Sequence, residues 1–239
     1  MIPRSKTVYF RLGNKTVPVK IISYGQKTDW VFINLHDDET SSVDAATQLL
    51  QATGGILIKL ENQQHRNITF WLAKRAYSFD PNRIFTRKGI INTVLKHGRY
   101  SKPAVDEIEK LGNRILQLVP ATATCIIALH NNREGQYSAA SYRAGAYKTT
   151  DARKVYLNPL QDTDDLFFTT DDILYEALAN KGYNTILQDN QNCVNDGSLS
   201  VYYGKKKFRY VNCETERGKT EKYLKMITDL SNVLDTIKK

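Results

Sequence analysis

Residues 30–39 read Trp-Val-Phe-Ile-Asn-Leu-His-Asp-Asp-Glu, a short apolar run that ends in four polar residues. A run of this length, followed at 40–42 by residues that favour helix N-caps, is typical of a buried strand that leads through a loop into a helix. The helical pattern continues to Ala52 and ends at Gly54 and Gly55. Because a strand buried on both faces belongs to a sheet covered by helices, this stretch predicts an α/β fold.

The same signals recur along the chain. Alternating segments on either side of Gly13 and Asn14 predict an N-terminal β-hairpin. We therefore expect one domain, residues 1–239, with a mixed, mostly parallel central sheet and helices on both faces. The predicted elements are strands at 7–12, 17–24, 30–35, 56–60, 68–72, 124–129 and 185–188, helices at 40–52, 103–118, 170–181 and 220–237, and a second hairpin of 199–203 and 209–214.

The composition is that of a soluble globular protein, with 41% hydrophobic and 25% charged residues in a chain of 239. No apolar stretch is long enough to predict a membrane span, and the first residues lack the apolar core of a secretory leader. We expect a soluble protein that is either cytoplasmic or exported after removal of a leader not present in this sequence.

The chain is basic, with 34 Lys and Arg against 25 Asp and Glu, a net charge of +9. Such a charge suits nucleic acid, an anionic surface or an acidic small substrate. A cluster at Lys205, Lys206, Lys207 and Arg209 is predicted as the solvated turn of the second hairpin. Because no nucleic-acid-binding motif accompanies the charge, nucleic acid is not expected as a partner.

Two histidines each follow an apolar strand directly. His36 comes after Val-Phe-Ile-Asn-Leu and His130 after Cys-Ile-Ile-Ala-Leu. Ligands of open α/β sheets bind at the carboxyl edge, so two imidazoles placed there by two strands can converge on one ion. Glu39, three residues beyond His36, supplies a third ligand. Two histidines and one carboxylate form a catalytic zinc set that leaves a position open for water, whose pKa zinc lowers to about 7.

A second group of polar residues lies at 75–85, in Arg-Ala-Tyr-Ser-Phe-Asp-Pro-Asn-Arg-Ile-Phe. The adjacent Asn82 and Arg83 follow a proline in a predicted turn. An arginine can bind a carboxylate with two parallel hydrogen bonds, and a neighbouring amide adds orientation. Because Asp, Asn and Pro are also common turn formers, the pattern fits a substrate clamp and a self-bonded loop about equally.

Taken together, these motifs resemble the zinc carboxypeptidase superfamily, and in particular its aspartoacylase and succinylglutamate desuccinylase branch. The resemblance rests on His-x-x-Glu after a strand, then Arg-x-x-x-x-Asp-x-Asn-Arg-Ile-Phe, then a strand ending in His. It implies that His36, Glu39 and His130 bind Zn²⁺ and that Asn82 and Arg83 bind the substrate carboxylate. It also implies that an upstream arginine polarises the scissile carbonyl; Arg75 is the favoured residue and Arg66 the less favoured one.

The resemblance further implies a glutamate general base on a late strand. The segment Tyr-Val-Asn-Cys-Glu-Thr-Glu at 210–216 offers Glu214 and Glu216, which share one face of a strand because side chains alternate with period two. Glu214 is favoured because it follows the apolar residues more directly, and Glu216 is the alternate base. A carboxylate in this place takes a proton from water and delivers it to the leaving nitrogen.

The sequence thus predicts a zinc-dependent hydrolase, a carboxypeptidase or amidohydrolase, that cleaves an amide bond next to a free carboxylate. Its substrate is expected to be a small peptide or an N-acyl amino acid. The alternative is a catalytically inactive protein of the same fold that binds a ligand or partner in the same cleft.

Overall fold

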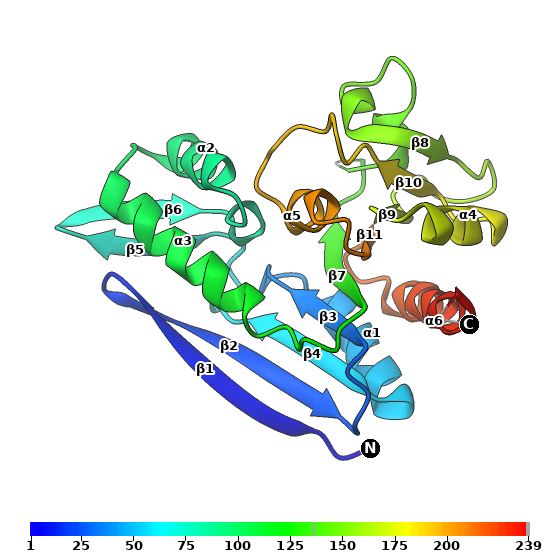
Figure 1. The fold of residues 1–239 in the computed structure, drawn as a ribbon, viewed down its shortest axis with the longest axis horizontal. Helices are drawn as coiled ribbons and strands as arrows, with labels where there is room; N and C mark the ends of the chain where they lie inside the picture. Colours follow the sequence, from blue (N-terminus) through cyan, green and yellow to red (C-terminus); the bar gives the residue numbers. More distant parts are fainter. Residues whose placement is uncertain (136, 238–239) are drawn as a thin grey trace.

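The computed structural model describes residues 1–135 and 137–237, in which nine strands form one mixed sheet (Figure 1). Its centre consists of four neighbouring strands that run parallel to one another. In sheet order these central strands are β4 (Gly55–Leu60), β3 (Trp30–Asn34), β7 (Cys125–Asn132) and β11 (Tyr210–Glu216).

The flanking strands complete the sheet on both sides. β2 pairs antiparallel with β4 and with β1, so the predicted N-terminal hairpin is confirmed. Beyond β11 follow β9, β10 and β8, of which β9 and β10 are parallel to each other. The bounds of these strands are β1 Arg4–Leu12, β2 Lys15–Tyr24, β8 Ala152–Tyr156, β9 Leu166–Thr169 and β10 Thr185–Gln188.

Helices cover both faces of the sheet, as the sequence predicts. Side chains of β3 alternate between two cores: Phe32 packs with one set of helices, Val31 and Ile33 with the other. The Phe32 side is covered by α1 (Thr40–Thr53), α4 (Asp172–Asn180) and α6 (Thr220–Ile237). The opposite side is covered by α2 (Arg87–His97), α3 (Lys102–Leu116), α5 (Leu199–Lys205) and a separate hairpin of β5 (Ile68–Leu72) and β6 (Arg75–Phe79).

The prediction of a second hairpin at 199–203 and 209–214 is wrong. Residues 199–205 form α5, whose N-cap Ser198 accepts a hydrogen bond from the amide of Val201 at 3.4 Å. Leu199 and Tyr203, four residues apart, both enter the core on one helical face. β11 pairs with β7 and β9 instead of with a preceding strand, so the basic residues at 205–209 lie at the end of a helix rather than in a hairpin turn.

Among the described residues, no helix is both long and apolar enough to cross a membrane.

The loop between β10 and α5 packs closely against α2. A Cβ atom on Gly89 would lie 2.2 Å from the Cα atom of Gly197 and 2.7 Å from the carbonyl oxygen of Asp196. The amide of Phe85 also donates to the carbonyl of Gly197 at 2.9 Å. These contacts fix the loop beside residues 81–83, which follow β6 as a short 3-10 turn.

We therefore expect Gly89→Ala to lower the free energy of unfolding by about 1–3 kcal/mol, because the added methyl group must displace backbone atoms. Gly98→Ala is the control: at the end of the same helix, a Cβ atom meets nothing closer than 3.9 Å. Its effect should stay within about 0.5 kcal/mol. Chemical denaturation measures both, and equal effects would contradict close packing at Gly89.

Candidate metal centre

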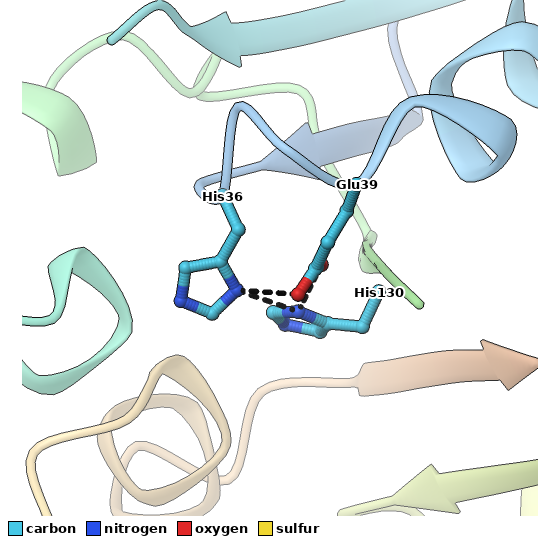
Figure 2. Close-up of side chains that lie close together, drawn as sticks. All are labelled: His36, Glu39 and His130. Carbon is cyan, nitrogen blue, oxygen red and sulfur yellow. Dashed lines mark hydrogen bonds and ion pairs between the residues drawn. The ribbon is translucent and has the colours of Figure 1, made fainter. Parts of the chain in front are cut away.

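Three side chains predicted as metal ligands converge at the carboxyl ends of β3 and β7 (Figure 2). Glu39 places Oε1 2.9 Å from Nδ1 of His36 and Oε2 2.9 Å from Nδ1 of His130. The two Nδ1 atoms lie 3.2 Å apart. All three residues are buried, and their nearest ligand atoms lie within 4.8 Å of one another.

The start of α1 leaves the carboxylate of Glu39 free to face the imidazoles. Glu39 is the N-cap residue, yet its side chain makes no capping hydrogen bond. Instead Asn131 of β7 accepts bonds from the amide of Ser42 at 3.1 Å and the hydroxyl of Ser41 at 3.0 Å. The capping function is thus supplied by the neighbouring strand.

The two aspartates between His36 and Glu39 hold the turn in place. Asp37 Oδ2 accepts hydrogen bonds from the amides of Asn62 and Gln64 at 2.7 and 2.8 Å. Asp38 forms an ion pair with Arg217 at 2.7 Å. These bonds anchor the turn to segments that follow β4 and β11.

The far nitrogen of each imidazole also has a partner. Nε2 of His36 lies 2.8 Å from Oδ1 of Asp80, and Nε2 of His130 lies 3.3 Å from Nδ2 of Asn82. A carboxylate on the far nitrogen fixes the orientation of a metal-binding histidine and raises its basicity. The contact with Asp80 therefore suits His36 to ligation through Nδ1.

Charge compensation dominates the electrostatics of this cluster. Burial lowers the pKa of His36, but the charges of Glu39 and Asp80 outweigh it and raise the pKa to about 9. Burial works against the ionised form of Glu39 too, yet the two imidazoles hold the pKa of its carboxyl well below its usual range. The pKa of His130 is lowered, chiefly by burial. The cluster therefore favours positive charge next to Glu39.

These residues fit a divalent metal ion. Two imidazole nitrogens and a carboxylate oxygen are ligands that transition metals accept, and three protein ligands leave a further position open. Among the described residues, this is the one group of His, Cys, Asp and Glu side chains whose ligand atoms meet in this way.

The cluster lies in a cavity of about 540 Å³ that also contains the favoured general base. Glu214 lines the cavity and is buried. Glu216 does not line it; its carboxylate instead forms an ion pair with Lys219 at 2.7 Å. The structure thus separates two residues that the strand pattern could not.

The environment of Glu214 in the cavity disfavours its ionised form. Burial raises its pKa to about 8, and the nearby charge of Glu39 adds to the increase. A hydrogen bond donated by Asn212 to Oε2 at 3.1 Å opposes this shift. A perturbed carboxyl group in a cavity is a frequent mark of a functional site.

The predicted carboxylate-binding pair lies in the same cavity. Asn82 is buried, and its Oδ1 accepts a bond from the amide of Leu199 at 3.3 Å. The guanidinium of Arg83 donates to the carbonyl of Asn82 at 2.8 Å and lies 3.5 Å from Asp196. Both contacts use NH1, which leaves other donors of the guanidinium for a ligand.

The structure does not bring Arg75 to the cavity. Arg75 begins β6 opposite Leu72, at the exposed turn of the β5–β6 hairpin, and does not line the cavity. Arg66, the less favoured residue, lines it and donates to Oε1 of Glu39 at 2.5 Å. The sequence could not separate the two arginines because the direction of this hairpin depends on tertiary packing.

Several residues around the cluster carry no sequence signal that would assign them a role. Asp80 stands inside the motif around Asn82 and Arg83, so its position was visible, but its contact with His36 was not. Asn131 directly follows His130, and only the packing of α1 against β7 reveals its capping function. Lys148, which also lines the cavity, carries no motif.

Comparisons with known proteins support the fold. No protein-family model and no curated protein matches the chain. Among solved structures, it is similar to an aspartoacylase family protein from Mesorhizobium loti, at 13% identity and a TM-score of 0.52, covering 98% of this chain and 67% of that one. The chain therefore has the zinc carboxypeptidase-like fold that the sequence predicts.

Two further solved structures are similar at TM-scores below 0.5. A succinylglutamate desuccinylase/aspartoacylase family protein from Shewanella amazonensis is 10% identical, with a TM-score of 0.46, and the match covers 98% of this chain and 73% of that chain. Bovine thrombin-activatable fibrinolysis inhibitor, solved with a tick carboxypeptidase inhibitor, is 14% identical, with a TM-score of 0.46 and coverage of 96% and 91%.

The raised pKa of Glu214 predicts a pH-dependent cost in the metal-free protein. Because the folded-state pKa of about 8 exceeds the usual 4.5, the folded state binds more protons between these values, and stability falls as pH rises from about 5 to 8. Glu214→Gln lacks this titration. We expect its stability relative to wild type to rise by on the order of 3 kcal/mol over that interval. Chemical denaturation of the chelator-treated proteins at pH 5 and 8.5 measures the difference in unfolding free energy between variant and wild type. A difference that does not change with pH would contradict the raised pKa of Glu214.

Proposed function

We propose that this chain is a zinc-dependent hydrolase, a carboxypeptidase or amidohydrolase, that cleaves the amide bond of a small peptide or N-acyl amino acid next to a free carboxylate. The observation that carries the proposal is the meeting of the His36, Glu39 and His130 side chains in one cavity with Glu214 and Arg83. Metal ligands, a candidate base and a carboxylate-binding group are the components that such a reaction needs.

His36, Glu39 and His130 would hold the ion. When bound, zinc supplies Lewis acidity, which makes water a better nucleophile and polarises a carbonyl group. Asp80 keeps the imidazole of His36 oriented through the 2.8 Å contact with Nε2. Positive charge beside Glu39 would also remove one cause of the raised pKa of Glu214 and so favour its ionised form at neutral pH.

Glu214 then acts as the general base. Its carboxylate accepts a proton from the attacking water and delivers that proton to the nitrogen of the departing amine. Burial in the cavity suits this function, because a carboxyl group with a pKa nearer to neutrality is both an adequate base and an adequate acid.

Arg83 and Asn82 orient the substrate by binding its free carboxylate. The planar guanidinium of Arg83 matches the shape of a carboxylate, and the buried side-chain amide of Asn82 would help to orient that carboxylate. We assign to Arg66, rather than to Arg75, the role of polarising the scissile carbonyl. Arg66 lies beside Glu39 within the cavity, where a cation would stabilise the oxyanion that forms at the carbonyl.

Metal content is the first measurement. We expect about one zinc ion per chain in wild type, by elemental analysis after purification and addition of zinc, and its loss in His36→Ala and His130→Ala. His65→Ala is the control, because His65 is exposed and outside the cluster. No zinc in wild type, or equal zinc in all four proteins, would contradict the proposed ligand set.

Hydrolysis tests the remaining roles. With acetylated dipeptides and N-acetyl amino acids as substrates, Glu214→Gln should lower kcat by about 10²–10⁴-fold with zinc retained. Glu216→Gln on the same strand face should change kcat little. Arg83→Met should lower kcat/KM by about tenfold to a hundredfold, because a charge-assisted hydrogen bond to the substrate is lost.

The same assay addresses the inactive alternative. Zinc and peptide binding without hydrolysis of any of these substrates would favour a ligand-binding protein of this fold. An unchanged rate in Glu214→Gln would reject Glu214 as the base.

A further inference from the structure

The basic cluster at 205–209, to which the proposed function gives no role, lies beside a second hollow in the protein. This hollow has a volume of about 230 Å³ and lies between α5 and the segment that follows α3, two helices on the same face of the sheet (Figure 1). Ser200 and Val201 of α5 line the metal-site cavity, whereas Tyr202 and Lys206 line the hollow. The two spaces share no lining residue, so the hollow is a separate site.

Most of the lining of the hollow is apolar. Val119 and Ala121 form one side, and the half-buried rings of Tyr202 and Phe208 form the other. Both rings pack on Tyr203 of the core, with ring centres 5.1 and 5.2 Å from that of Tyr203. Small-molecule sites usually exceed about 300 Å³, so the hollow suits a single bulky side chain better than a whole ligand.

The rim of the hollow is basic. Lys206 lines it, with Nζ 4.6 Å from the ring centre of Tyr202. The segments on its two sides, 115–124 and 199–209, contain four Lys or Arg residues and no Asp or Glu. Arg209 pairs with Asp171 at 3.0 Å, but Lys206 and Lys207 form no ion pair within residues 1–135 and 137–237. These two ammonium groups favour an anionic partner.

Lys207 is held in a backbone conformation that a lysine rarely adopts. α5 ends in a Schellman motif, in which the amide of Phe208 donates to the carbonyl of Tyr203 and the amide of Lys207 to that of Gly204, both at 3.0 Å. Lys207 consequently has a φ of +54°, in the left-handed region where glycine is favoured and any other side chain costs conformational free energy. Strain of this kind is frequent at functional positions.

We propose that the hollow binds an acidic peptide segment of a partner protein, with one bulky apolar side chain in the hollow and carboxylates beside Lys206 and Lys207. An apolar hollow next to cations matches an anchor residue within an acidic stretch. A membrane surface matches less well, because the two rings line a hollow instead of projecting into the solvent. The inference does not rest on the proposed function, since it involves neither the metal ligands nor the base.

The probe is the peptide Asp-Glu-Phe-Glu-Asp, labelled with fluorescein at its N-terminus and amidated at its C-terminus. Amidation removes the free α-carboxylate that Arg83 is proposed to bind. Titration with the full chain, followed by fluorescence anisotropy, should show saturable binding that weakens with added salt. Asp-Glu-Ala-Glu-Asp should bind at least about tenfold more weakly, because the apolar anchor is lost, and Asn-Gln-Phe-Gln-Asn about tenfold more weakly, because the charge is lost.

Variants of the protein test the two parts of the site. Lys206→Gln combined with Lys207→Gln should weaken binding about threefold to tenfold, and Lys88→Gln, an exposed position on α2, is the matched control. Ala121→Trp fills the hollow from an exposed position and should abolish binding. Lys207→Gly separates conformation from charge: it should raise the denaturation midpoint and still weaken binding.

The inference would be overturned by the absence of saturable binding, by equal binding of the neutral peptide, or by unchanged binding in the double lysine variant. A loss of binding with Arg83→Met would place the peptide in the metal-site cavity and overturn it as well. Vesicles of phosphatidylserine and phosphatidylcholine are the second probe. Lysine-dependent binding to these vesicles without binding of the peptide would assign the surface to an anionic membrane instead.

Discussion

The carboxylate of Glu39 is shared by two buried imidazoles, and much of the surrounding structure keeps it available to them. A glutamate at a helix N-terminus would ordinarily accept a bond from a nearby amide, but the amide of Ser42 donates to Asn131 instead. Asp37 and Asp38 are tied to other segments, which leaves the turn little freedom. The geometry of the cluster therefore depends on contacts from β7 and from the segments that follow β4 and β11 as much as on the residues that form it.

The strands and helices that bury an apolar face were predictable from the sequence. β3 and β7 read as apolar runs because both faces are covered, and α1, α3 and α6 carry clear helical spacing. Two of the elements that were not predicted were missed for different reasons. Residues 199–203 were predicted as a strand, but they form a helix capped by Ser198. β8 is an edge strand without a fully buried residue and offers little apolar signal.

In the candidate site, too, some residues were predictable from the sequence and others were not. His36, Glu39 and His130 were predictable, because each is fixed relative to the end of a strand and parallel strands end at one edge. Residues on connections were harder to place. Arg66 and Arg75 lie on segments whose course is set by how the β5–β6 hairpin packs, and Lys148 lies where no periodic pattern exists. The sequence pattern therefore identified the metal-ligand cluster, Glu214 and the Asn82–Arg83 pair, but not Arg66 and Lys148 on the cavity wall.

The parallel pairing of β3 with β7 also constrains how the protein can assemble. His36 and His130 are 94 residues apart in sequence, and they meet only after β7 has taken its place in the sheet beside β3. Long-range parallel pairing forms slowly, because a large loop must close first. A nascent chain that has exposed β3 and α1 to the solvent still lacks the second imidazole. An ion held by all three side chains would therefore lock a completed sheet rather than start its folding.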